Sequence, residues 1–217
     1  MSTRAFEAEL RAGLQALGLV LSDLQVGQLL DYLALIQKWN KVYNLTSVRD
    51  PAEMLSLHLL DSLAAVPPLQ RHLASLGQGA RKLLDVGSGG GLPGVVFAIC
   101  CPELSVSCVD TVAKKAAFVQ QVAAELRLGH LRGVHARVES LSGPFDVVSC
   151  RAFASLPDFV NWSQAALGEG SVWLAMKAKH PVDELAALPA TVQVFHVEQL
   201  QVPGLEAERC IIWMKPA

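Results

Sequence analysis

The glycine-rich stretch that follows Leu84 constrains the fold of this chain more than any other part of the sequence. It reads LDVGSGGGLPG over residues 84–94, and apolar residues flank it on both sides. Glycine adopts positive φ readily and lets the backbone approach a ligand closely. Such stretches are typical of the turn between a buried strand and a helix. The sequence therefore predicts an α/β fold with a ligand-binding turn after its first strand.

Asp85 lies two residues before the first glycine of this stretch and indicates the kind of ligand. A carboxylate at that position repels a phosphate group but attracts a cation. S-adenosyl-L-methionine (S-adenosylmethionine) carries no phosphate, and it bears an ammonium and a sulfonium group. We therefore expect S-adenosylmethionine to bind here, in contact with Asp85, Gly87, Gly89 and Gly91.

The same stretch leaves two alternatives open. Gly89, Gly91 and Gly94 have the spacing of the nicotinamide or flavin dinucleotide fingerprint, in which a helix N-terminus binds a pyrophosphate. Asp110 ends the next expected strand, where an acidic residue binds ribose hydroxyls, and it suits both ligands because both contain an adenosine ribose. The second alternative is a glycine-rich turn that binds no ligand.

Composition and charge limit the cellular setting and the partners. The 217 residues include five cysteines, which form neither C-x-x-C pairs nor a metal-ligand spacing with the six histidines. We therefore expect reduced core cysteines and no metal site. Because residues 1–7 lack the apolar core of a secretory signal, we expect a cytoplasmic protein. We also expect it to be a monomer. The net charge of −2 disfavours binding of naked nucleic acid through many phosphates. An RNA substrate would need a local basic patch or presentation within a larger particle.

The hydrophobic pattern divides the chain into a helical region over 1–80 and an α/β region over 81–217. Because the second holds the glycine stretch, we expect it to be an S-adenosylmethionine-dependent methyltransferase domain. In the first, Ser22 and Gln25 match a capping box, Pro51 starts a second helix, Pro67-Pro68 is expected to end it, and 77–79 is expected to be a linker. In the second, strands alternate with helices, which predicts a seven-stranded, mostly parallel, Rossmann-like sheet with an antiparallel C-terminal pair. The strands are expected at 82–86, 105–110, 131–136, 145–150, 170–177, 191–200 and 208–215, and the helices at 93–101, 113–127, 155–167 and 181–187.

Polar residues at the carboxyl ends of these strands are the candidates for the site, because ligands of open α/β sheets bind there. Glu139 follows the third expected strand, where it could face an adenine, and Arg151 follows the fourth, a strand expected to point at the reactive centre. Lys177 and Lys179 end the fifth strand as a candidate RNA patch. Lys114 and Lys115 fit a solvated helix face better than a phosphate contact.

The segment after the fourth strand bears on the chemistry. It reads SCRAF over 149–153 and lacks the Asn/Asp/Ser-Pro-Pro-aromatic loop that holds an exocyclic amine. A ring nitrogen such as guanine N7 attacks with a free lone pair and needs no such loop, so the segment favours a ring-nitrogen nucleophile. Cys150 leaves a pyrimidine C5 methyltransferase open, but without a Pro-Cys setting a structural cysteine is favoured.

The helical region holds two further groups of polar residues. Cations, aromatics and amides interleave over 38–46, which suits nucleic acid, although Trp39 and Tyr43 could equally belong to the core. His58 and Asp61 lie three residues apart and are expected to form a local hydrogen-bonded pair.

Taken together, these blocks resemble the glucose-inhibited division protein B family, whose members are guanine-N7 methyltransferases of small-subunit ribosomal RNA. The resemblance runs from about Trp39 to the C-terminus. It rests on WNKVYNLT at 39–46, HLLDS at 58–62, the glycine stretch ending in LPG at 94, RVE at 137–139, RAFASL at 151–156 and Lys177. The chain departs from the family at Cys150, where Ser is common, and at Ala178, where Gly is common.

The resemblance implies methyl transfer to N7 of a specific guanine in 16S ribosomal RNA, either free or in a small ribosomal subunit precursor. It implies that Gly87, Leu92, Val138, Glu139 and Arg151 contact S-adenosylmethionine. The expected contacts to RNA are Lys41, Asn44, Arg49, Lys177 and Lys179. Two other functions stay open: a methyltransferase for a small molecule or protein, and a non-catalytic RNA-binding module with a vestigial cofactor loop.

Overall fold

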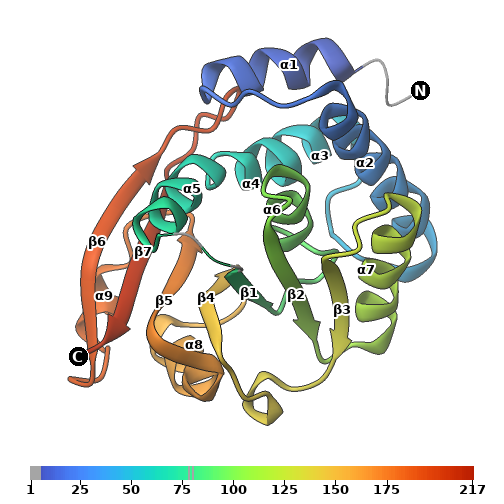
Figure 1. Cartoon of the computed structure of the whole chain (residues 1–217). Coiled ribbons are helices and arrows are strands. Elements are labelled where there is room, and N and C mark those ends of the chain that lie inside the picture. The colour runs from blue at the N-terminus through green and yellow to red at the C-terminus, as the bar shows by residue number, and fades with distance from the viewer. Residues whose placement is uncertain (1–5, 78, 80) are drawn as a thin grey trace.

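The computed structural model describes residues 6–77, 79 and 81–217, and its centre is a seven-stranded sheet (Figure 1). The strand order is β3-β2-β1-β4-β5-β7-β6, with β7 antiparallel to both β5 and β6 and the other pairs parallel. The strands are β1 Arg81–Val86, β2 Leu104–Asp110, β3 Leu131–His135, β4 Phe145–Arg151, β5 Leu167–Lys177, β6 Val192–Leu200 and β7 Arg209–Pro216. The mostly parallel sheet with an antiparallel C-terminal pair is confirmed.

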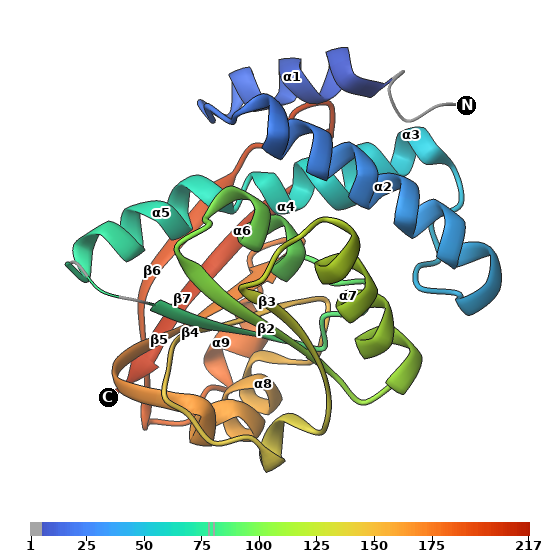
Figure 2. The same cartoon turned by 45° about the vertical axis from the view of Figure 1, so that its right-hand side comes forward.

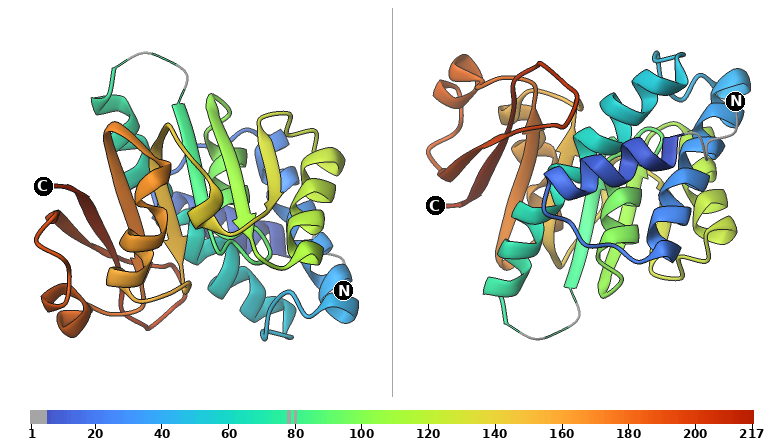
Figure 3. Two further views of the ribbon diagram at one scale, coloured as in Figure 1. Left: turned by 90° about the horizontal axis from the view of Figure 1, so that it is seen from below. Right: turned by 90° about the horizontal axis from the view of Figure 1, so that it is seen from above.

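Helices cover both faces of the sheet and make three layers (Figures 1 and 2). One face carries α1 Glu7–Ala16, α2 Asp23–Tyr43, α3 Pro51–Met54, α4 Asp61–Leu63, α5 Val66–Ser75, α6 Gly94–Cys100 and α7 Ala113–Glu125. The other face carries α8 Leu156–Ser163 and α9 Val182–Ala186. Viewed from above, α1 crosses outside the other helices of its face, and viewed from below, α8 lies over the opposite face (Figure 3).

The helical region and the sheet share one hydrophobic core on the first face. Leu29 and Leu33 of α2, Leu59 before α4 and Phe97 of α6 are all fully buried in it together with Leu83 of β1. Burial of apolar side chains drives this packing. The division into a region 1–80 and a domain 81–217 therefore stays a prediction, since residue 80 and part of the expected linker, residue 78, lie outside the described residues.

Two of the expected helix starts are confirmed, and a side chain caps each of them. Ser22 and Gln25 form a reciprocal capping box at the start of α2, and Asp50 caps α3 by accepting a hydrogen bond from the amide of Ala52. The prediction for Pro67-Pro68 is wrong, because the preceding helix already ends at Leu63 and these prolines lie in the first turn of α5. Proline suits a first turn, where its missing N–H has no helical partner to lose.

Two other elements differ from expectation. Residues Leu55–Leu60 form a π-helix between α3 and α4, instead of continuing an α-helix. The helix expected over 155–167 ends at Ser163 and is followed by a 3₁₀ turn, Gln164–Ala166, because Leu167 already pairs with Phe145 at the start of β5. In the described ranges, none of the helices has the length and apolar character to span a membrane. Residues 1–5, part of the segment on which the expectation of no secretory signal rests, lie outside those ranges.

Candidate functional site

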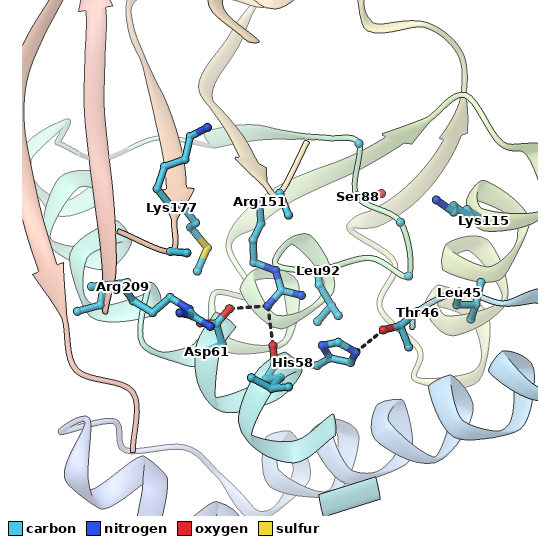
Figure 4. Close-up of a pocket in the computed structure, with 18 of the residues that line it drawn as sticks. Leu45, Thr46, His58, Asp61, Ser88, Leu92, Lys115, Arg151, Lys177 and Arg209 are labelled. Atoms are coloured by element: carbon cyan, nitrogen blue, oxygen red, sulfur yellow. Dashed lines mark hydrogen bonds and ion pairs between the residues drawn. The ribbon is translucent and has the colours of Figure 1, made fainter. Parts of the chain in front are cut away.

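Two adjoining cavities lie at the carboxyl edge of the parallel strands, with volumes of about 590 and 370 Å³. Figure 4 shows residues that line the larger one. They share Gly87, Lys115 and Ala152 as a common wall. The larger cavity is also lined by Leu45, Thr46, Leu57, His58, Asp61, Ser88, Gly89, Gly90, Leu92, Arg151, Met176, Lys177, Ala178, Leu200, Arg209 and Cys210. The smaller is also lined by Val86, Val109, Asp110, Thr111, Val112, Ala136, Arg137, Val138, Glu139, Phe153 and Trp162.

The glycine stretch forms the turn between β1 and α6 and borders both cavities. Gly87, Gly89 and Gly91 have φ of +63°, +58° and +90°, a region that other residues adopt only with strain. A Cβ atom at Gly87 would also overlap the ring of Phe153. From the other side, the hydroxyl of the fully buried Tyr32 on α2 donates to the carbonyl oxygen of Gly90 at 2.6 Å. The helical layer thus fixes the position of the turn.

Asp110, at the end of β2, binds the glycine turn directly. One carboxylate oxygen accepts from the amide of Gly89 at 3.0 Å, and the other accepts from the amide of Val112 at 2.8 Å. Lys115 lies with its Nζ 3.8 Å from the same carboxylate. Asp110 also lines the smaller cavity, so it faces any ligand bound there.

Asp85 lies beneath the turn and is fully buried. Its Oδ2 accepts from the amide of Gly94, at the first residue of α6, at 2.9 Å, and its Oδ1 accepts from the hydroxyl of Ser149 on β4 at 2.8 Å. Burial raises its pKa to about 7, although these two hydrogen bonds and the charge of Arg151 act in the opposite direction. Asp85 lines neither cavity, so it supports the turn from below and its direct contact with a ligand stays a prediction.

Arg151, at the end of β4, enters the larger cavity and is held by the helical layer (Figure 4). Its Nη1 donates to Asp61 at 2.6 Å and to the backbone carbonyl of Leu57 at 3.0 Å. The other oxygen of Asp61 accepts from Nε of Arg209, at the start of β7, at 2.7 Å. π-helical turns are frequent at functional sites, and here Leu57 belongs to the π-helix that immediately precedes Asp61. Ala152, directly after Arg151, has φ +51°, which marks local backbone strain.

The expected pair of His58 and Asp61 is wrong. Nε2 of His58 lies 2.9 Å from the hydroxyl oxygen of Thr46, whereas both oxygens of Asp61 bind arginines. The π-helical geometry over 55–60 alters the side-chain spacing on which the expectation depends. Burial and then the charge of Arg151 lower the pKa of His58, so its imidazole is neutral at pH 7.

The smaller cavity brings together residues from three strand ends. Val138 and Glu139 lie in the 3₁₀ turn after β3, Val138 buried and Glu139 exposed. Phe153 and Trp162 also line this cavity, with their ring centroids 5.8 Å apart. Apolar rings together with carboxylates suit a ligand with a flat ring and hydroxyl groups.

The candidate RNA contacts do not form one cluster. Lys41 and Lys179 are exposed. Asn44 ends α2 in the left-handed region and accepts from Arg49 Nη2 at 2.8 Å, so these two form a local pair. Lys177 lines the larger cavity, but its Nζ also donates to Glu184 at 2.7 Å and to the carbonyl of Ala154 at 3.0 Å.

The sequence left two interpretations open for Lys114 and Lys115, and also for the aromatic pair Trp39 and Tyr43. Lys114 is exposed, whereas Lys115 is half-buried and borders both cavities. The ring of Trp39 packs 5.4 Å from that of Phe118 in the core and 5.1 Å from that of the more exposed Tyr43. Trp39 is therefore mainly a packing residue.

The cysteines are buried, and none forms a disulfide. Burial raises the pKa of the Cys150 thiol, which opposes formation of the thiolate that C5 chemistry requires. No group of His, Cys, Asp and Glu side chains suited to a metal ion occurs in the described part of the chain.

Several residues of the site were not singled out from the sequence. Thr46, Tyr32, Trp162 and Arg209 reach the cavities or the glycine turn only through contacts between distant segments; Arg209 lies 148 positions from Asp61. Arg209 starts an expected antiparallel strand, which places it at the same edge as the parallel strand ends. That position is the one signal that could have identified it.

Comparisons with known proteins agree with this geometry. The family model GidB, described as rRNA small subunit methyltransferase G, matches residues 25–212. Ribosomal RNA small subunit methyltransferase G of Acidovorax sp. (strain JS42) is 71% identical over 222 residues, which cover 100% of this chain and 98% of that protein.

Solved structures are similar in fold at low identity. Magnesium protoporphyrin IX methyltransferase from Synechocystis PCC 6803 aligns with a TM-score of 0.62 at 11% identity, covering 86% of this chain and 98% of its own. A SAM dependent methyltransferase from Aquifex aeolicus aligns with a TM-score of 0.54 at 13% identity, covering 77% and 99%. These likenesses show the fold alone, and they confirm the expected fold of S-adenosylmethionine-dependent methyltransferases.

Proposed function

The chain belongs to the GidB family of rRNA small subunit methyltransferase G proteins, and from this premise we propose that it transfers a methyl group from S-adenosylmethionine to N7 of a specific guanine in 16S ribosomal RNA. Work on ribosomal RNA makes the cytoplasm its proposed location, where we expect it to act as a monomer. The substrate is either the free RNA or a small ribosomal subunit precursor.

One observation carries the choice of cofactor: carboxylates already bind two amides of the turn that a pyrophosphate would need. The amide of Gly89 donates to Asp110, and the amide of Gly94 at the start of α6 donates to Asp85. A helix N-terminus binds an anion through such free N–H groups, and the carboxylate of Asp110 would repel a phosphate. The turn therefore favours S-adenosylmethionine over a nicotinamide or flavin dinucleotide.

The remaining groups of the two cavities fit the parts of S-adenosylmethionine. We assign the adenosine end to the smaller cavity, where carboxylates can accept from ribose hydroxyls and apolar side chains can pack against adenine. We assign the methionine end to the glycine turn and the larger cavity. The proposed contacts are Gly87, Gly89, Leu92, Asp110, Val138, Glu139 and Arg151, with Asp85 and Gly91 supporting the turn. When bound, this cofactor supplies an electrophilic methyl group.

The larger cavity suits a nucleophilic atom that carries no proton and therefore needs no base. Both oxygens of Asp61, which lines this cavity, bind arginines, and Nε2 of His58 is bonded to the hydroxyl of Thr46 while its Nδ1 is buried. No general base is therefore proposed, because guanine N7 attacks with its own lone pair. Orientation of the two reactants can supply roughly 7–11 kcal/mol of the barrier, and Arg151 would contribute by fixing the geometry.

RNA binding is assigned to cations that lie on different segments, of which Lys177 lines the larger cavity. We propose that Lys41, Arg49, Lys177 and Lys179 hold phosphates and that Asn44 contacts a nucleotide. With a net charge of −2 on the whole chain, these cations would supply the electrostatic attraction. An assembled particle would add contacts that these few cations cannot supply.

The test uses methyl transfer from labelled S-adenosylmethionine. Free 16S ribosomal RNA, small ribosomal subunits and total cell protein, each from cells lacking the gene, are incubated with the protein. Mass mapping of the labelled RNA then locates the modified base. We expect one 7-methylguanosine in 16S ribosomal RNA.

Label in protein or in a small molecule would instead support the alternative methyltransferase. Calorimetric titration that shows no binding of S-adenosylmethionine would support the RNA-binding module. Preferred binding of NADH would overturn the assignment of the cofactor.

A further inference from the structure

Three cations meet at the carboxyl edge of the sheet, on neighbouring strands. Arg151 ends β4 and Lys177 ends β5, and Arg209 starts the antiparallel β7 at the same edge, where Lys177 pairs with Cys210. Glu184 binds Lys177 at 2.7 Å and compensates its charge. The two guanidinium groups remain, and side by side they would repel each other.

Asp61 lies between these two guanidinium groups. It is the only carboxylate among the described residues that line the larger cavity, and its side chain is 6% exposed. One oxygen binds Arg151 at 2.6 Å and the other binds Arg209 at 2.7 Å. Charge-assisted hydrogen bonds of this kind are short, and they fix the orientation of the guanidinium plane.

The π-helix adds a second anchor on Arg151. The backbone carbonyl of Leu57 accepts from the same Nη1 atom at 3.0 Å, so both hydrogens of that nitrogen are directed into the helical layer. The Nε and Nη2 groups of Arg151 have no protein partner among the described residues. They are therefore available to oxygen acceptors of a ligand in the cavity.

We propose that Asp61 is a positioning residue, which acts through Arg151 and Arg209 and orients their remaining donors toward oxygen acceptors of the target nucleotide. The inference rests on the proposed function, because it concerns how the RNA is aligned for methyl transfer. Through Asp61, the helical layer takes a direct part in building the site. The glycine turn and the strand ends alone do not complete it.

The test compares Asp61→Asn with a matched control at the opposite end of β4. There Asp146 binds Arg81 at 3.1 Å and the amide of Lys82 at 2.8 Å. Each variant is assayed for kcat and KM with small ribosomal subunits, after thermal unfolding has shown that it is folded. Because small misplacements of a positioning group carry large penalties, we expect Asp61→Asn to lower kcat about 10²-fold. We expect Asp146→Asn to leave kcat unchanged.

Two further variants separate positioning from folding. Asp61→Glu keeps the charge on a longer side chain and is expected to give a kcat between those of the wild type and Asp61→Asn. In an Arg151→Lys background, Asp61→Asn is expected to lower kcat far less than it does alone, because the group through which it acts is already altered. An undiminished effect in that background, or equal losses for Asp61→Asn and Asp146→Asn, would overturn the proposal.

A crystal structure of Asp61→Asn gives a readout that does not depend on activity. We expect the guanidinium groups of Arg151 and Arg209 to separate, and unchanged positions would refute the inference. A wild-type protein without transfer to RNA would refute the proposed function instead, and the crystal structure would still decide whether Asp61 holds the two arginines.

Discussion

The two ends of β4 each carry an arginine–aspartate pair, yet the pairs differ in their surroundings. At the amino end, Arg81 and Asp146 are 23% and 27% exposed and join the neighbouring strands β1 and β4. At the carboxyl end, Arg151 and Asp61 are 17% and 6% exposed and join β4 to the helical layer. The carboxyl-end pair lines the larger cavity. An identical chemical pair is thus structural at one edge and part of a candidate site at the other.

Backbone strain also differs between the edges. Positive φ occurs before β1 at Gly77, where glycine adopts it readily, but at the carboxyl edge it occurs at Ala152 as well as at Gly87, where the two cavities meet. Strained residues persist where the surrounding structure holds them, and they cluster at functional sites. Burial and strain, rather than residue type, therefore distinguish the site at the carboxyl end of β4 from the ion pair at its amino end.

The largest expected effect is on activity, from Arg151→Ala compared with Arg81→Ala. We expect Arg151→Ala to lower methyl transfer about 10²-fold, because the group that fixes the reacting geometry is lost. Asp61 keeps its second partner, Arg209, so the variant should remain folded. Arg81→Ala should leave the transfer rate unchanged. Equal rates for the two variants in a labelled-methyl assay would break the distinction between the edges.

The buried carboxyl group of Asp85, near the carboxyl end of β1, is expected to make the free energy of unfolding depend on pH. Its pKa is raised from 3.8 to about 7 by burial, so the folded state holds the proton more tightly than the unfolded state does. Its contribution to stability is therefore complete below about pH 4 and is lost as the pH rises to about 7. We expect the free energy of unfolding of the wild type to fall relative to that of Asp85→Asn, by up to about 1.4 kcal/mol per pH unit. Urea unfolding between pH 4 and 8 measures this, and parallel curves would contradict it.

Gly87→Ala and Gly77→Ala test the two ends of β1 with the same change of residue type. Gly77, before β1, has φ +74° and open space where a Cβ atom would be added, so alanine there adds only backbone strain of about 1 kcal/mol. At Gly87 the new methyl group would also overlap Phe153, and we expect a loss of about 2 kcal/mol together with weaker binding of S-adenosylmethionine. Thermal unfolding and calorimetric titration check both values. Equal behaviour of the two variants would show that the turn is not closely packed.

The smallest effect is expected for Asp146→Asn. The pair with Arg81 is partly exposed, and such ion pairs contribute little. We expect a loss of about 1 kcal/mol in the free energy of unfolding and unchanged affinity for S-adenosylmethionine. A larger loss, or a change in affinity, would mean that the amino edge also shapes the site.

Local patterns were sufficient for much of this fold. The strand expected over 82–86 is β1 at Arg81–Val86, and the one expected over 208–215 is β7 at Arg209–Pro216. Apolar runs bounded by turn residues identify such strands without tertiary information. The capping box at Ser22 is similarly local, since both of its partners lie within four residues.

The parts that sequence reasoning missed depend on distant contacts. The hydrogen-bonding pattern of the π-helix at 55–60 leaves no periodic signal in the sequence. Asp85 was expected to face a ligand, and its partners Ser149 and Gly94 become visible only once β4 and α6 are placed. Asp61 and Arg209 meet across 148 positions, so no local spacing connects them. Element types were thus predictable, whereas the pairing of charged groups between layers was not.

The hydroxyl of Tyr32 that holds Gly90 has a practical consequence for dissecting this protein. A fragment beginning at β1 would retain every glycine of the turn but lose the phenol that anchors it, and it would uncover the apolar side chains that α2 packs against. Such a truncated enzyme is expected to aggregate rather than serve as a minimal catalyst. Engineering of substrate choice therefore has to start from the intact chain.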